Sequence, residues 1–222
     1  MSESGKRVPI LSVLYERYLD EQNTADFIAQ VSTHYTPGTL QRLAEADDSR
    51  VRRAAILGLG FIGDYEVNHT MGRALHDGDR TVRMLAENGI RHIWMRAGSG
   101  QDHRELEEII RLNTARHFDE AIEKATELIS RSPWFAEAWN QRAIAHFNRG
   151  NYVESIRDCH QSLEINPYHF AAASGMGQAY LQLGNPVSSL ECFRRALRLN
   201  PNLEGVRAQI DRLSRLTEDR NK

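Results

Sequence analysis

The residues that most invite a chemical interpretation are an acid, a thiol and an imidazole in a row, Asp158, Cys159 and His160. A thiol beside a histidine can be an activated nucleophile, provided that the imidazole reaches the sulfur. On a helix, successive side chains point about 100° apart, and a face is shared only at a spacing of three or four residues. The local structure of this stretch therefore decides between a reactive thiol and a core cysteine.

The nine histidines call for a search for metal ligands. His69 and His76 would share a helix face, but seven residues rise about 10 Å, too far for one ion to bridge. The segment "HDGDR" has two acids around a glycine and lacks the ligand spacing of a calcium loop. We expect no metal and no cofactor, and interpret Asp79 as the cap of a following helix.

Prolines at a constant spacing reveal a repeat in the C-terminal half. Pro133, Pro167 and Pro201 lie 34 residues apart. In this register the sequence aligns "RHFDEAIEKATELISRSP", "GNYVESIRDCHQSLEINP" and "GNPVSSLECFRRALRLNP", and also "AEAWNQRAIAHFNRGN" with "FAAASGMGQAYLQLGN". The columns carry small and apolar residues at helical spacing, which predicts two helices in each repeat.

The repeat register assigns Cys159 to the interior. It shares a column with Ala125 and Phe193, which would pack the second helix of a repeat against the first. Asp158 and His160 are assigned to other faces. Because a thiol buried among apolar residues is normally inert, we expect a core cysteine. A redox or catalytic thiol stays open as the alternative.

The 34-residue unit resembles the tetratricopeptide repeat. It has bulky Trp139 at a helix start, small residues at Ala143 and Gly177, and a closing proline. The resemblance covers residues 102–203 as three units, of which the first matches least well. A single apolar stripe over residues 204–217 predicts a capping helix.

A second period runs through the N-terminal half. The sequence aligns "TLQRLAEADDSRVRRAAI" from Thr39 with "TMGRALHDGDRTVRMLAE" from Thr70, at a spacing of 31 residues and without a gap. A short helix, an Asp-rich turn and "VRR" or "VRM" opening an apolar helix resemble the HEAT repeat, and "GLGFIGD" resembles short bacterial HEAT-like units. Two earlier helices, about Pro9–Asp20 and Thr24–His34, are expected to cap this half.

The sequence therefore predicts an all-α fold, a two-part right-handed α-solenoid. Residues 1–98 would form HEAT-like helical repeats with N-terminal capping helices, and residues 99–101 a short junction. Residues 102–222 would form three tetratricopeptide-like repeats, a capping helix and a short tail. The combination resembles small bacterial repeat proteins, a resemblance that carries no activity with it.

Eight arginines lie between Arg50 and Arg96, interspersed with aspartates. Asp48 and Arg52, like Asp79 and Arg83, have the spacing of i,i+4 ion pairs. In HEAT-like stacks such residues form ladders between neighbouring repeats, which we expect here, with contact to phosphate or an acidic partner as the alternative. The net charge of −2, spread evenly over both halves, argues against nucleic acid as the main partner.

Composition is that of a folded protein, with 41% hydrophobic and 26% charged residues. No apolar run approaches the roughly 18–20 residues of a membrane helix. Glu16 and Arg17 interrupt the first apolar stretch, which makes it a poor signal peptide. The two cysteines provide neither a disulfide framework nor a CxxC pair. We expect a reduced, cytoplasmic location and no membrane association.

The resemblance to the tetratricopeptide family assigns peptide binding to the first helix of each repeat, on the concave face. The matching positions combine side-chain amides with apolar anchors. They are Asn140, Ile144, Phe147, Asn148, Ser174, Gln178, Leu181 and Gln182. Chaperone-binding members hold a terminal carboxylate with lysine and asparagine, and no lysine stands at the matching positions. A mostly neutral peptide segment is therefore the expected ligand.

The predicted function is a non-enzymatic adaptor or scaffold that binds a protein or peptide partner on the concave face. The sequence contains no P-loop, GxSxG or paired-carboxylate motif. One alternative is a subunit or accessory factor of an enzyme of the HEAT-like lyase type, which would involve Cys159. A second is binding of nucleic acid or an acidic partner through the arginine-rich half.

Overall fold

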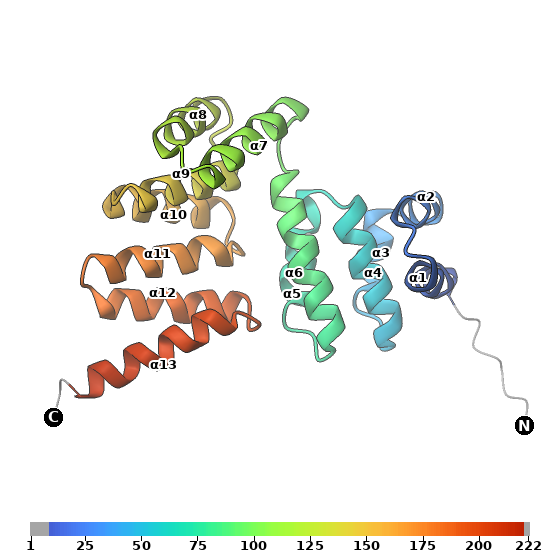
Figure 1. Ribbon diagram of the computed structural model, residues 1–222. Helices are drawn as coiled ribbons and strands as arrows, with labels where there is room; N and C mark the ends of the chain where they lie inside the picture. Colours follow the sequence, from blue (N-terminus) through green and yellow to red (C-terminus); the bar gives the residue numbers. More distant parts are fainter. Residues whose placement is uncertain (1–8, 220–222) are drawn as a thin grey trace, which may run out of the picture. The chain divides into compact units, whose positions relative to one another are not determined.

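The computed structural model describes residues 9–219, and these residues form helices joined by short turns, without a strand among them (Figure 1). The predicted all-α class is confirmed. The chain divides into two compact units, residues 1–93 and 94–222. The repeat boundaries expected from the sequence stay a prediction.

The first unit consists of short helices followed by one long helix. Its elements are α1 (Ile10–Glu21), α2 (Thr24–His34), α3 (Pro37–Leu43), α4 (Ser49–Ile62), the 3-10 turn η1 (Tyr65–Val67), α5 (Asn68–Ala74) and α6 (Arg80–Met95). Asn23, Thr36 and Asp48 cap α2, α3 and α4, their side chains accepting hydrogen bonds from first-turn N–H groups. The two expected N-terminal helices are thus present, to within one residue.

Helix α4 is the centre of the first unit. It contacts α1, α2, α3 and α5, and its Ile56 and Leu59 are fully buried. Helix α6 approaches α4 closely at Gly89, where a Cβ atom would lie 2.9 Å from the Cα of Gly60 and 2.5 Å from Cε of Met71. Only glycine fits such an approach without displacing a neighbour.

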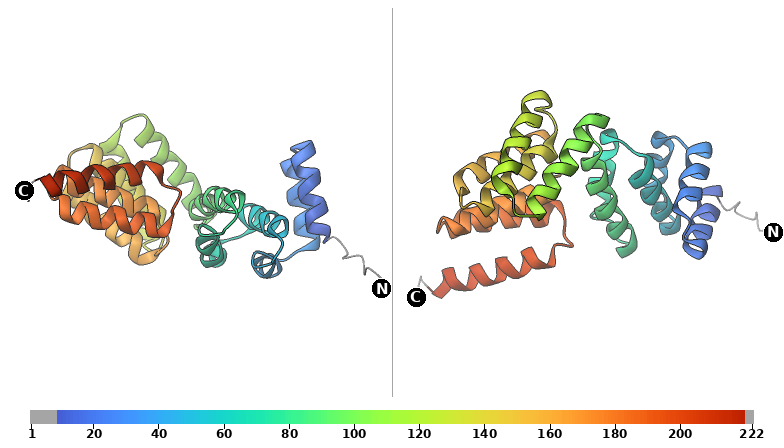
Figure 2. Two further views of the ribbon diagram at one scale, coloured as in Figure 1. Left: turned by 90° about the horizontal axis from the view of Figure 1, so that it is seen from below. Right: turned by 45° about the horizontal axis from the view of Figure 1, so that its top comes forward.

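The second unit consists of three helix pairs and a last helix. Its elements are α7 (Gly100–Thr114), α8 (Phe118–Arg131), α9 (Ala136–Asn148), α10 (Tyr152–Ile165), α11 (Phe170–Gln182), α12 (Pro186–Leu199) and α13 (Glu204–Asp219). The three pairs and the last helix are those that the 34-residue period predicts. Helix α13 packs against α12 at the C-terminal end of the stack (Figures 1 and 2).

The first helices of the three pairs form one layer of the second unit, because α9 contacts both α7 and α11. Helices α8 and α10 each pack between the first helix of their own pair and that of the next. Gly177 allows α11 to meet α12, since a Cβ there would lie 2.7 Å from Cδ1 of Phe193. The largest fully buried side chains of the unit are Phe135, Phe170 and Phe193.

Helix α6 ends at Met95 and α7 begins at Gly100. Ser99 and Asp102 start α7 with a capping box, in which each side chain accepts a hydrogen bond from the backbone N–H of the other residue. The expected junction at residues 99–101 thus coincides with the beginning of a helix. Among residues 9–219, no helix is both long and apolar enough to cross a membrane.

Candidate partner-binding surface

Cys159 lies in the core of the second unit, as its column predicts. Its side chain packs with Phe193 and other apolar residues, and the residue is only 2% exposed. Burial, to which the neighbouring Asp158 carboxylate adds, raises the pKa of the thiol to about 12. His160 is exposed and its Nδ1 lies 3.3 Å from Glu164. The geometry is that of an inert core thiol.

Asp158 is also buried, which the sequence did not indicate. Its two oxygens accept hydrogen bonds of 2.8 Å from Nε and Nη2 of Arg142, and Nη1 of Arg142 donates to the Thr126 hydroxyl. His146 lies near this pair and is half buried, which lowers the pKa of its ring. This planar guanidinium–carboxylate pair joins α9 to α10.

The predicted binding residues lie on α9 and α11, and seven of the eight are exposed or partly exposed. The exposed members are Ile144, Asn148, Gln178 and Gln182, whereas Phe147 and Leu181 are half buried. Ile144 keeps 39% of its surface exposed. The ring of Phe147 meets Tyr152 edge-on at 5.4 Å between centroids, which holds it in one orientation. Ser174 is half buried on the same helix as Gln178.

Asn140 is buried, although its column in the repeat predicts a position on the peptide-binding face. Its side-chain amide donates to Oε1 of Glu137, as does the amide of Gln141. The second carboxylate oxygen of Glu137 accepts a 2.9 Å hydrogen bond from Nε2 of His169, whose Nδ1 accepts the N–H of Ala172 and so is unprotonated. Asn140 therefore orients a buried carboxylate instead of facing solvent.

The pKa of Glu137 lies below its ordinary value. Burial by itself would raise it, and the hydrogen bonds from His169, Gln141 and Asn140 outweigh that effect. The sequence showed no sign of this group, because Glu137 and His169 lie in different columns of the repeat. Its role is to connect α9 with the start of α11.

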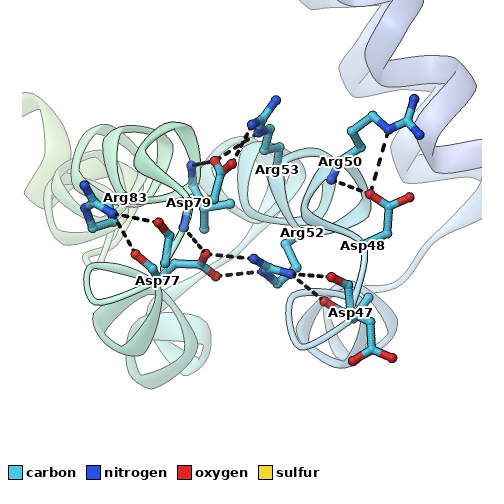
Figure 3. A network of polar contacts seen from close by, with 11 residues as sticks. Asp47, Asp48, Arg50, Arg52, Arg53, Asp77, Asp79 and Arg83 are labelled. Carbon is cyan, nitrogen blue, oxygen red and sulfur yellow. Dashed lines mark hydrogen bonds and ion pairs between the residues drawn. The ribbon is translucent and has the colours of Figure 1, made fainter.

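The arginines of the first unit form the expected ladder between its two sequence repeats (Figure 3). Arg52 donates from Nε and Nη2 to both oxygens of Asp77, at 2.8 and 2.9 Å. Arg53 donates to both oxygens of Asp79, at 2.9 and 2.5 Å. The carboxylate that Arg52 binds thus belongs to the next repeat. The i,i+4 spacing in the sequence had instead predicted Asp48 as the partner of Arg52.

Asp79 also caps α6, as predicted, by accepting the N–H of Val82. The hydrogen bond from Arg53 lowers the pKa of Asp79 to about 2, with burial opposing it. Hydrogen bonds from Arg52 and the backbone lower the pKa of Asp77 against the effect of burial. The guanidinium groups of Arg52 and Arg53 are therefore already bound to carboxylates of the chain itself.

The same backbone contacts recur one repeat later. Nη1 of Arg52 donates to the carbonyls of Ala46 and Asp47, and Nη1 of Arg83 donates to those of Asp77 and Gly78, all displaced by 31 residues. The 31-residue period is thus a period of local side-chain contacts, between an arginine and the turn before its helix, as well as of sequence. Among residues 9–219, no group of three or more His, Cys, Asp or Glu side chains could hold a metal ion.

Comparison with known proteins identifies the repeat of the second unit. Residues 134–202 match the family model of the tetratricopeptide repeat. A TPR repeat-containing protein of Rhizobium etli is 35% identical over 94 residues, which is 42% of this chain and 46% of that protein. Protein SGT1 homolog of rice (Oryza sativa) is 35% identical over 79 residues, 36% of this chain and 20% of that protein. The chain spans less than half the length of either relative.

Solved structures agree on the fold of the second unit. The first TPR of Spaghetti (RPAP3), bound to an HSP90 peptide of sequence SRMEEVD, aligns with a TM-score of 0.52 at 21% identity, covering 55% of this chain and 96% of that one. The Sgt2 TPR domain from Aspergillus fumigatus aligns at 0.53 and 17%, covering 55% and 83%. The second unit therefore contains tetratricopeptide repeats in an all-helical solenoid.

Proposed function

We propose that this protein is a non-catalytic interaction adaptor whose second unit binds an extended peptide segment along α9 and α11. The observation that carries the proposal is the row of uncharged side chains on these two helices, in which Ile144, Asn148, Gln178 and Gln182 are exposed and Leu181 is half buried. Amides can donate to and accept from a peptide backbone, and apolar side chains supply the anchor that dominates affinity.

The chemistry of this surface favours a mostly neutral segment. None of the eight positions is charged, and lysine is absent from the places that hold a terminal carboxylate in chaperone-binding relatives. In the RPAP3 structure the ligand is an acidic HSP90 peptide. We infer that this protein shares the mode of binding and differs in the charge of the ligand.

The proposal is tested by selecting peptides that bind the immobilised full chain from a displayed random library. The affinity of the best peptide is then measured by titration. Replacing Ile144 with Lys places a charge in the row and should weaken the peptide at least about tenfold, the effect of losing an anchor worth about 1.4 kcal/mol or more. The matched control is Val187→Lys on α12, at a position that is 65% exposed and outside the row. Equal affinity of both variants for the peptide would remove this surface from consideration.

We further infer that the first unit is built from HEAT-like repeats and that the chain works in a reducing, cytoplasmic setting. The contacts of Arg52 with Asp77 and of Arg53 with Asp79 support the first inference, since they join the two sequence repeats as the ladders of that class do. Two free and buried thiols, Cys159 and Cys192, support the second.

A further inference from the structure

The 34-residue period places two equivalent spaces between helices, here called slots, in successive repeats of the second unit. The residues at equivalent positions in the two slots differ. In the slot between α8, α9 and α10, Arg142 binds Asp158 through two hydrogen bonds and Thr126 closes one side. The carboxylate that binds the Arg142 guanidinium thus comes from the chain itself, at Asp158. The slot is consequently filled.

The next slot lies between α10, α11 and α12, where the equivalents of Arg142, Asp158 and Thr126 are Met176, Cys192 and His160. An apolar pair has replaced the ion pair. The slot is open, forming a depression of about 590 Å³ with Met176, Tyr180 and Cys192 in its lining. Met176 and Cys192 are both largely buried and belong to the apolar core cluster.

Basic side chains surround this depression. His160, Arg194, Arg195 and Arg198 line it, against Glu191 as the acid among the lining residues. In the described part of the chain, the guanidinium groups of Arg194 and Arg195 form no hydrogen bond or ion pair with another residue. Burial raises the pKa of Cys192 to about 11, so that its thiol adds no negative charge.

We propose that this depression is a second docking surface, which takes an acidic segment of a partner protein. Guanidinium groups bind carboxylates through two parallel hydrogen bonds, the arrangement that Arg142 and Asp158 form one repeat earlier. The flexible thioether of Met176 adapts to an apolar side chain of the same segment. The partner would thus supply the carboxylate that this repeat lacks.

A protein segment fits this surface better than a nucleic acid does. The lining is apolar at Met176 and Tyr180, and it contains the acid Glu191. The chain as a whole has a net charge of −2, which provides no extended positive field for a phosphate backbone. The basic side chains that line this depression match a short acidic motif.

The test measures fluorescence anisotropy of a fluorescein-labelled peptide EELEEL with the full chain, beside the neutral peptide QQLQQL. EELEEL should bind at least tenfold more tightly, and Arg194→Glu/Arg195→Glu should remove that preference. The matched control is Arg104→Glu/Arg111→Glu on α7, two exposed positions with the same change of charge, which should change the affinity less than twofold. An equal loss in both double variants, or equal binding of the two peptides, would overturn the proposal.

A second variant fills the slot instead of reversing its charge. Met176→Arg/Cys192→Asp recreates the ion pair of the preceding repeat and should abolish EELEEL binding while circular dichroism still reports a helical protein. Retained binding in that folded variant would overturn the proposal. Tighter binding of an oligonucleotide dT10 than of EELEEL, sensitive to Arg194→Glu/Arg195→Glu, would assign the depression to nucleic acid instead.

Discussion

The Arg142–Asp158 pair provides a sharp test of what holds α9 to α10. Replacing Asp158 with Ala leaves the guanidinium of Arg142 without its carboxylate. Breaking a fully buried pair costs about 3–5 kcal/mol of unfolding free energy. The side chains of Arg142 and Asp158 are 16% and 6% exposed, and water can therefore solvate part of the arginine. We expect a loss of about 2–3 kcal/mol.

The double variant Arg142→Met/Asp158→Cys should be much less harmful. It copies the residues that occupy the equivalent positions, Met176 and Cys192, in the next repeat. Since it leaves no charge unpaired, its unfolding free energy should stay within about 1 kcal/mol of the wild-type value. The unfolding free energies of the wild type, of Asp158→Ala and of the double variant are measured by urea unfolding, with circular dichroism as the readout. A double variant as unstable as Asp158→Ala, or a single variant that loses less than about 0.5 kcal/mol, would refute the reasoning.

Three further predictions concern both units. Because the pKa of Asp79 is lowered from 3.8 to about 2 in the folded state, it stabilises the fold above pH 4 and loses that effect between pH 4 and 2. The difference in melting temperature between wild type and Asp79→Asn should therefore shrink over this range, and a constant difference would contradict it. Gly89→Ala should lower the unfolding free energy by about 1–3 kcal/mol through overpacking, whereas Gly78→Ala, with open space around its Cβ position, should change it by less than about 0.5 kcal/mol. Cys159 should resist a thiol reagent at pH 8 in the native protein and react on unfolding, as measured by mass spectrometry; rapid native labelling would place it at the surface.

The helices of the second unit were predictable because their signal is local and repeated. Three prolines at a 34-residue spacing predict where helices end. Small residues such as Gly177 indicate where two helices approach one another closely. The structure places α7 to α13 at these positions. Cys159 was assigned to the core by the same register, because its column packs inward in every repeat.

The polar contacts between helices were less predictable. The sequence indicated that Arg52 and its neighbours pair with aspartates, and the pairing partner proved to be Asp77 of the next repeat. An i,i+4 spacing describes which side chains are neighbours on one helix. It contains no information on how the next repeat stacks, and that stacking brings Asp77 within reach of Arg52.

Asn140 shows the same limit at the candidate surface. Its column places it on the first helix of a repeat, where the family binds peptides, and the structure turns its amide to the buried carboxylate of Glu137. That carboxylate also binds His169, which lies 32 residues later in the sequence. Side chains without such a distant neighbour, such as Gln178 and Gln182, stay exposed as their columns suggest.

The sequence by itself determined the period, the helices and the inward position of Cys159, since these follow from local spacing repeated along the chain. Only the tertiary structure decided which polar side chains are buried and which stay exposed to solvent. Stacking brings residues 16 to 32 positions apart into contact, and replacing one residue in a column changes the contacts of its neighbours. Thus the ion pair of Arg142 closes one slot, and Met176 leaves the equivalent slot open to a partner.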